Sequence, residues 1–425
     1  MGPAEPITAG NTLASRTGWF IAWGVFAFFQ RLFRDLRGLP RPVYVLVGGQ
    51  FVNRFGSFVM PFLTLFLSGR GFSMGHVAAV IGAMSVGGLF GPFVSGYLSD
   101  ALGRRNTIVV SLLTSAVSLL GLYWCSTVPA LMALSAFHGF CAFLYNPAAN
   151  ALLTDLVTKE QRVTAFALMR LAVNAGFAAG PAVAGLLYHR APILIFIGDA
   201  LTTLTFAGFA WFWLPHGLRT VEGRAAAVAV IWRSWAEALA DVGRNRRFLQ
   251  YLAALLFMAI SFLQVGNVLA IDTITRGITP EQYGLIMGFN GVLIVCFELP
   301  VTHWARRFPL RRVLICGYAI IGLGCASFAF AHGLTGYLLA MTLYTFGEML
   351  SLPIGSSYSG ELAPEKFRGR YFGVSGTVWA IAGLVGSGGI WCYGQLGPIW
   401  WIIAGASGVV GAFVILPQPR VPAAR

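Results

Sequence analysis

Charged residues are scarce in this chain. Asp, Glu, Lys and Arg make up 10% of its 425 residues, whereas hydrophobic residues make up 57%, and the mean hydropathy is +0.74. Soluble globular domains carry about 25% charged residues. The composition therefore excludes an ordinary soluble domain and predicts an integral membrane protein.

Several signatures of chemistry are also absent from the sequence. No Gly-x-x-x-x-Gly-Lys-Ser/Thr run occurs, which argues against ATP as an energy source. The six cysteines include no Cys-x-x-Cys pair, and the six histidines show no ligand spacing. We therefore expect no disulfide, metal or other cofactor. A membrane-embedded enzyme would need such a constellation, so it is only a remote alternative, and we expect that the chain is not an enzyme.

Twelve apolar runs are long enough to cross a bilayer, which takes about 20 mostly apolar residues. They lie at 43–67, 77–98, 106–125, 129–153, 163–187, 191–214, 248–272, 283–304, 311–330, 334–358, 369–394 and 397–416. An earlier run at 19–33 is shorter and ends in basic residues. We expect it to be an amphipathic interfacial helix, with an extra span as the alternative.

The long polar connection at 215–247 divides the runs into two sets of six, and 232–242 within it can form a surface helix. We predict an all-α membrane protein of two pseudo-symmetric bundles. Its parts are the N-terminal segment 1–42, the bundles 43–214 and 248–416, the central loop 215–247 and the tail 417–425.

The formal net charge of +14 comes from 29 Lys and Arg against 15 Asp and Glu. Both ends of the chain and the loops after even-numbered spans hold most of the basic residues, whereas the opposite loops hold Arg70, Arg190 and Arg276. Basic loops favour the cytoplasmic side. The charge therefore predicts cytoplasmic termini in a bacterial inner membrane rather than binding to nucleic acid.

The two halves of the sequence repeat each other. A shift of 206 residues aligns Pro147 with Pro353, Asp155 with Glu361, Arg162 with Arg368, and Gly180 with Gly386. Parallel repeats with a site between them are a transporter design.

The loop after the second run reads Gly96-Tyr-Leu-Ser-Asp100-Ala-Leu-Gly103-Arg104-Arg105. It resembles the Gly-x-x-x-Asp-x-x-Gly-Arg-Arg signature of the major facilitator superfamily. The resemblance implies a secondary transporter that works by alternating access. It also implies a cytoplasmic gate formed by Asp100, Gly103, Arg104, Arg105, Asp155 and Arg162.

The fifth run contains Gly176-Phe-Ala-Ala-Gly180-Pro181-Ala-Val-Ala-Gly185, which is similar to a motif of the drug:proton antiporters of that family. Close helix packing explains these glycines equally well. The sequence departs from the antiporters in the fourth run, where His138 stands instead of an Arg. The second-half copy of the loop signature has lost its acid and both glycines.

Ionisable side chains inside predicted spans are costly and are functional candidates by default. The candidates for proton coupling are Glu348, Asp199, Glu298 and His138. The candidates for substrate binding are Asn53, Arg54, Arg170, Asn174, Phe289, Tyr344 and Trp379. Glu348 has to be protonated, paired or directed into the cavity, and if it faces the cavity we expect Arg54 of the other half to be its partner. Asp272 and Glu281 lie at helix ends and are expected to be solvated. A structural ion pair is the alternative for each buried charge.

Taken together, the sequence predicts proton-coupled efflux of amphiphilic small molecules or drugs by a monomeric transporter. Its partners would be the small-molecule substrate, protons and the lipid bilayer. Proton-coupled uptake of a solute with an anionic group, such as a peptide or organic acid, is the alternative, because Arg54 and Arg170 are natural partners for an anion.

Overall fold

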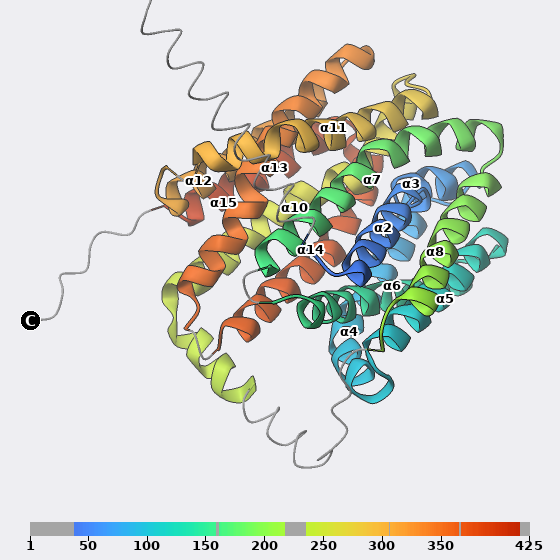
Figure 1. Cartoon of the computed structure of the whole chain (residues 1–425). Coiled ribbons are helices and arrows are strands. Elements are labelled where there is room, and N and C mark those ends of the chain that lie inside the picture. The colour runs from blue at the N-terminus through green and yellow to red at the C-terminus, as the bar shows by residue number, and fades with distance from the viewer. Residues whose placement is uncertain (1–37, 159–160, 217–234, 306, 365–366, 417–425) are drawn as a thin grey trace, which may run out of the picture.

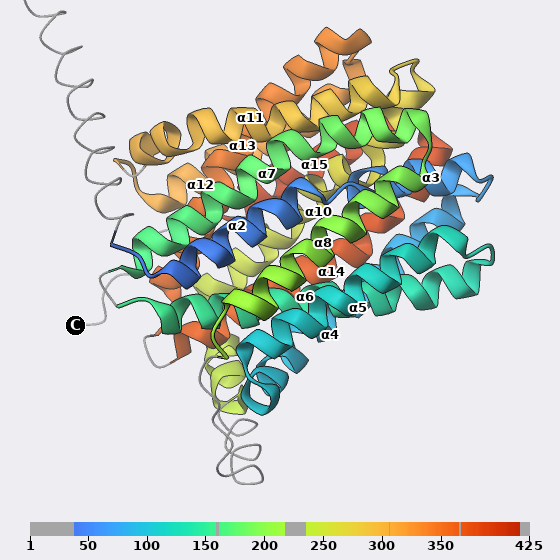
Figure 2. The same cartoon turned by 45° about the vertical axis from the view of Figure 1, so that its right-hand side comes forward.

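The computed structural model describes residues 38–158, 161–216, 235–305, 307–364 and 367–416 (Figures 1 and 2). Within these ranges every regular element is a helix. The predicted interfacial helix at 19–33 and the tail at 417–425 lie outside the described residues. The described part of the central connection, 235–244, is helical, and this agrees with the surface helix expected there.

Long apolar helices account for the predicted spans. The first six are α2 (Arg41–Phe55) with α3 (Val59–Gly69), α4 (Met74–Leu102), α5 (Arg104–Trp124), α6 (Val128–Leu156), α7 (Arg162–Arg190) and α8 (Ile193–Trp213). The next six are α10 (Arg246–Thr275), α11 (Pro280–Ala305), α12 (Leu310–Ser327) with the short helix η1 (Phe328–Phe330), α13 (Gly333–Leu362), α14 (Arg368–Leu396) and α15 (Ile399–Val414). Among the described residues eleven segments can cross a membrane by length and composition, and α15 is a shorter apolar helix. The twelve-helix prediction is confirmed.

The first span differs from its prediction because it is interrupted. α2 ends at Phe55, and α3 begins at Val59. Pro61 has no backbone N–H to donate to a preceding turn, so it fits the first turn of a new helix rather than the middle of a continuous one. The carboxylate of Asp199 on α8 accepts a hydrogen bond of 3.1 Å from the N–H of Val59. A buried acid thus satisfies a backbone donor that the break exposes.

The helices pack with the same partners in each half. In the first half α6 lies against α4 and α5, while α2 lies against α7 and α8; in the second half α13 lies against α11 and α12, while α10 lies against α14 and α15. Among the described helices, α7 with α11 and α4 with α14 join the halves most extensively, and these two pairs are exchanged by the same symmetry; α3 with α10 adds a smaller contact between the halves. Figure 1 shows α7 and α11 running side by side.

We call the two ends of the helices the Arg70 end, where α3 leads into α4, and the Arg104 end, where α4 leads into α5. The halves meet closely toward the Arg70 end. The hydroxyl of Tyr283 donates a hydrogen bond of 2.8 Å to the carbonyl oxygen of Pro61, and His189 lies 2.9 Å from the carboxylate of Glu281. Both contacts connect helices of different halves.

Glycines allow the backbones of α7 and α11 to touch. A Cβ on Gly284 would lie 2.3 Å from the carbonyl oxygen of Pro181, and one on Gly185 would lie 2.6 Å from that of Pro280. Gly180 of the same motif instead faces α2, where a Cβ would lie 2.4 Å from the carbonyl oxygen of Phe55. The glycine motif therefore packs α7 against helices on both sides, which is its structural explanation.

Candidate functional site

A cluster of polar side chains lies where α7, α11 and α13 meet between the halves. Arg170 on α7 forms an ion pair with Glu298 on α11, and Asn174 donates a hydrogen bond of 3.0 Å to the same carboxylate. Arg170 and Asn174 are one helical turn apart, so they present both donors on one face. Glu298 is 9% exposed, whereas the side chain of Arg170 is 49% exposed. The pair thus joins the halves with its acid buried and its base accessible.

A second carboxylate lies beside this pair. Glu348 on α13 accepts a hydrogen bond of 3.0 Å from the side-chain amide of Asn290 on α11, and that amide also donates 2.9 Å to the hydroxyl of Thr345. Glu348 interacts electrostatically with both Glu298 and Arg170. These groups border a cavity of about 70 Å³, which is lined by Arg170, Asn174, Ile294, Glu298, Glu348, Met349 and Leu352.

The cluster is unbalanced in charge. Its two carboxylates share one guanidinium, and Arg170 makes its direct contact with Glu298. An uncompensated carboxylate in a membrane interior is costly, because it has lost the water that would solvate it. Glu348 therefore has to hold a proton or attract a cation when the cavity is closed to water. Among the described residues no three His, Cys, Asp or Glu side chains lie together as a metal site would require.

The expected pairing of Glu348 with Arg54 is wrong. Arg54 lies next to the break in the first span, and its charge interacts with Asp199 and Tyr145 of its own half. Within the described part of the chain its Nε has no hydrogen-bond partner. The sequence placed Arg54 and Glu348 at similar depths, but helix rotation directs them to different neighbours.

Asn53 and Asp199 belong to the surroundings of this break. The amide of Asn53 donates a hydrogen bond of 3.0 Å to the hydroxyl of Thr203, one turn after Asp199 on α8. Asp199 is buried and binds the start of α3. These contacts connect the interrupted span to α8. Asp199 therefore stabilises the break in the first span, and it is also a candidate for proton coupling.

His138 lies away from the cluster. It is buried between α6 and α5, where its Nδ1 is 3.0 Å from the hydroxyl of Ser118 and 3.3 Å from the carbonyl oxygen of Ser115. Both partners belong to α5. The structure thus places His138 in a packing contact within the first half.

The three aromatic candidates lie in the second half, outside the lining of the cavity. The hydroxyl of Tyr344 donates a hydrogen bond of 2.8 Å to the carbonyl oxygen of Phe262, and the rings of Tyr344 and Trp379 lie 5.7 and 5.5 Å from the Phe262 ring. Phe289 is partly buried and packs against the cluster of Leu293, Ile294 and Met349. This aromatic group borders the polar cluster through α13, because Tyr344 precedes Glu348 by one turn.

The predicted gate residues divide between two contacts at the Arg104 end. Arg104 forms an ion pair with Asp155 and donates 2.7 Å to the carbonyl oxygen of Ala151, so it ties α5 to α6 within one half. Arg105 instead lies 2.6 Å from His216 and over the Trp211 ring at 4.9 Å. Gly103 makes the turn with a φ of 89°, a conformation that suits glycine.

Two further gate candidates lie nearby. Asp100 is in the last turn of α4, and its side chain is outside the described part. Arg162 begins α7, and its Nε has no partner among the described residues. The Arg104–Asp155 contact is the part of the predicted gate that the structure brings together.

Asp272 and Asn290 show what the sequence did not reveal. Asp272 was expected to be solvated, but it is fully buried and bonded to Tyr337, Tyr393 and Arg276. Asn290, which holds Glu348, was not a candidate. An amide inside an apolar run was the available signal, as it is for Asn53 and Asn174.

Known proteins of related sequence are transporters by name. The chain is 25% identical to a Na(+), Li(+), K(+)/H(+) antiporter of Planococcus maritimus, over 87% of this chain and 94% of that protein. It is 25% identical to the multidrug resistance protein MdtH of Cronobacter sakazakii, over 77% of this chain and 80% of the relative. An uncharacterized MFS-type transporter of Bacillus subtilis, YqjV, is 24% identical over 78% of this chain and 81% of its own length.

Solved structures share the fold at lower sequence identity. The nucleoside transporter NupG superposes with a TM-score of 0.75 at 17% identity, covering 88% of this chain and 99% of that one. A POT family transporter in complex with 5-aminolevulinic acid gives a TM-score of 0.73 at 15% identity, covering 88% and 95%. The family model described as Major Facilitator Superfamily matches residues 46–273 and 265–425. With its twelve helices in two repeated halves, the chain belongs to the major facilitator superfamily and is a multi-pass membrane transporter.

Proposed function

We propose that this transporter exports amphiphilic small molecules in exchange for protons. The observation that carries the proposal is the pair of acids, Glu298 and Glu348, which share one guanidinium beside a cavity between the halves. A proton-coupled exchange needs an acid that can hold and release a proton, here Glu348, and a partner that remains charged, here Arg170.

The proposed cycle uses competition at Glu348. When the acid is protonated, the cluster is neutral and can be enclosed between the halves. When the acid loses its proton, it attracts a cationic or hydrogen-bonding substrate into the cavity. Arg170 cannot take the proton, because a guanidinium stays charged at any physiological pH.

We propose further that the Arg104 end faces the cytoplasm of a bacterial cell and that the protein works as a monomer. The basic loops support this orientation. The close contacts between the halves toward the Arg70 end support a state that opens toward the Arg104 end. The Arg104–Asp155 pair lies within one half in this state, and we propose that it contacts the other half when the molecule reverses.

The named relatives support exchange rather than uptake, because one is an antiporter and another a multidrug resistance protein. The first of these also supports a second candidate, in which Na⁺, Li⁺ or K⁺ is the exchanged substrate. A monovalent cation would be attracted to the same unbalanced carboxylate. Proton-coupled uptake of an anionic solute is the third reading, for which Arg54 and Arg170 would supply the charge.

Transport in proteoliposomes with an imposed pH gradient tests these readings. We expect a lipophilic cationic dye to move against the proton flow, and a K⁺ or Na⁺ gradient to have little effect. Glu348→Gln keeps the shape of the side chain but cannot release a proton. It should therefore lose gradient-driven transport and retain exchange of dye for dye.

The matched control is Glu237→Gln, which removes an exposed acid from the connecting helix 235–244. It should transport normally. Unchanged proton-driven transport by Glu348→Gln would overturn the assignment of this acid. Movement of dye or peptide in the same direction as the protons would favour uptake, and proton release driven by Na⁺ or K⁺ would favour the cation antiporter.

A further inference from the structure

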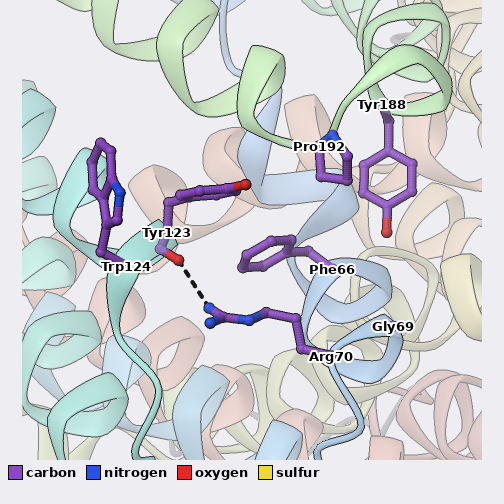
Figure 3. A pocket seen from close by; sticks show the side chains of 7 residues that line it. All are labelled: Phe66, Gly69, Arg70, Tyr123, Trp124, Tyr188 and Pro192. Atoms are coloured by element: carbon purple, nitrogen blue, oxygen red, sulfur yellow. Dashed lines mark hydrogen bonds between the residues drawn. The ribbon is translucent and has the colours of Figure 1, made fainter.

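A second cavity lies outside the central cluster, at the Arg70 end of the first half. Its volume is about 370 Å³, within the usual range of small-molecule sites. Its lining, drawn in Figure 3, is Phe66, Gly69, Arg70, Tyr123, Trp124, Tyr188 and Pro192. The Phe66 ring lies between the Tyr123 ring, at 5.7 Å, and the Arg70 guanidinium, at 5.4 Å.

The internal repeat supplies a reference for this cavity. A shift of 206 residues aligns Arg70 with Arg276, and both side chains bind the carbonyl oxygens that end the third span of their half. Arg70 donates to Tyr123 and Cys125 at 2.9 and 2.8 Å. Arg276 donates to the equivalent residues, Ala329 and Ala331, at 3.2 and 3.0 Å.

The two arginines differ in how their charge is neutralised. Arg276 lies 3.0 Å from Asp272, whose carboxylate also accepts hydrogen bonds of 2.6 Å from the hydroxyls of Tyr337 and Tyr393. The residue equivalent to Asp272 in the first half is Phe66. Among the described side chains no carboxylate lies within ion-pair distance of Arg70.

Donors for an anion are nevertheless present around Arg70. The hydroxyls of Tyr123 and Tyr188 make no hydrogen bond with any described residue, and Figure 3 shows the Tyr188 hydroxyl directed toward Gly69. In the second half the arginine at this position is thus neutralised by one carboxylate, which also accepts hydrogen bonds from two tyrosine hydroxyls. In the first half Phe66 stands in place of that anion, and the cavity beside it is lined by the guanidinium and two phenols.

We propose that this cavity binds the anionic headgroup of a membrane phospholipid. The phosphate would accept hydrogen bonds from Arg70 and a tyrosine hydroxyl, and the apolar part would lie against Phe66 and Pro192. A lipid is favoured over a free anion because the lining is largely aromatic and lies at the helix ends. Trp124 at its edge is 64% exposed, as is typical of tryptophans at the bilayer surface.

The test measures the thermal unfolding temperature of the full chain in detergent. The probes are short-chain phosphatidylglycerol, phosphatidylcholine of the same chain length, and inorganic phosphate. We expect phosphatidylglycerol alone to raise the unfolding temperature of the wild type. Arg70→Gln should weaken the apparent affinity for it by about tenfold or more, since a charge-assisted hydrogen bond is lost.

Two further variants serve as controls for this result. Gly69→Leu keeps Arg70 but fills the cavity, because Gly69 is part of the lining. A Cβ at this position meets no atom closer than the Tyr188 hydroxyl, at 3.6 Å, so the backbone can accept it. It should lose the effect of phosphatidylglycerol even if Arg70→Gln folds poorly. Arg190→Gln removes a cation from the same end without changing the lining, and it should respond as the wild type does.

Three outcomes would overturn the proposal. The first is an equal response of Gly69→Leu and the wild type to phosphatidylglycerol. The second is an equal effect of phosphatidylcholine, which would show that the negative charge plays no part. The third is full stabilisation by inorganic phosphate alone, which would identify a site for free anions. The proposal is independent of the direction of transport.

Discussion

The turns that follow the first span of each half have the same backbone and different side-chain chemistry. Gly71 and Gly277 have φ values of 83° and 79°. The N–H of Phe72 binds the carbonyl oxygen of Leu67 at 3.3 Å, and the N–H of Ile278 binds that of Thr273 at 2.9 Å. These are the bonds of a glycine-ended helix.

The side chains around the two turns differ, so Arg276 and Arg70 have different partners. In the second half the arginine completes a closed network with a buried acid and two phenols. In the first half the equivalent arginine donates to carbonyl oxygens, lies over the Phe66 ring and borders a cavity. The comparison teaches that the repeat duplicates the backbone geometry, while the residue at one position, Phe66 or Asp272, decides whether the arginine has a carboxylate partner within the protein.

The largest expected effect is at the buried acid. Asp272→Asn removes the negative charge from a network in which Arg276 remains, so the guanidinium loses its partner in a place with little water. Breaking a buried ion pair costs about 3–5 kcal/mol. We expect the unfolding temperature in detergent to fall by several degrees.

The control for this change is Glu281→Gln at the same end of the molecule. Glu281 pairs with a His189 side chain that is 68% exposed, and an exposed pair contributes about 1 kcal/mol or less. Similar losses for the two variants would mean that the Asp272 network does not stabilise the second half as its burial implies.

A smaller and sharper difference is expected between two tyrosines. Tyr393→Phe removes a hydrogen bond to a carboxylate, which is worth about 1.5–3 kcal/mol. Tyr188→Phe removes a hydroxyl that has no partner among the described residues, so it should change the stability of the lipid-free protein very little. Thermal unfolding of both variants checks this. Equal losses of stability would show that the Tyr188 hydroxyl has a hydrogen-bond partner within the protein and is not available to a ligand in the cavity.

The smallest effect should be the same in both halves. Gly71→Ala and Gly277→Ala each place a Cβ on a backbone with positive φ, in a space with no atom within 4 Å. The cost is then the left-handed conformation itself, about 1–2 kcal/mol in each case. Unequal changes in unfolding temperature would show that the backbones of the two turns are not equivalent.

The sequence by itself determined the number of the membrane helices and their approximate positions, because a span needs a long apolar run and this requirement is local. It also determined the repeat, since a common shift aligns Pro, acid and Arg at several positions. The contact of Arg104 with Asp155 was within reach because the family signature places both at one end. The interruption at 56–58 was not predicted, although Gly56 lies in it and Pro61 follows it in the first turn of α3.

Only the tertiary structure decided which buried groups meet. Glu348 meets Asn290 rather than Arg54, His138 faces α5, and Asp272 is enclosed by Tyr337 and Tyr393. Each of these contacts joins different helices, and it depends on how each helix is rotated about its axis and where it crosses its neighbour. Hydropathy does not encode that rotation when a helix is apolar on most of its surface, because lipid and protein then offer it similar surroundings.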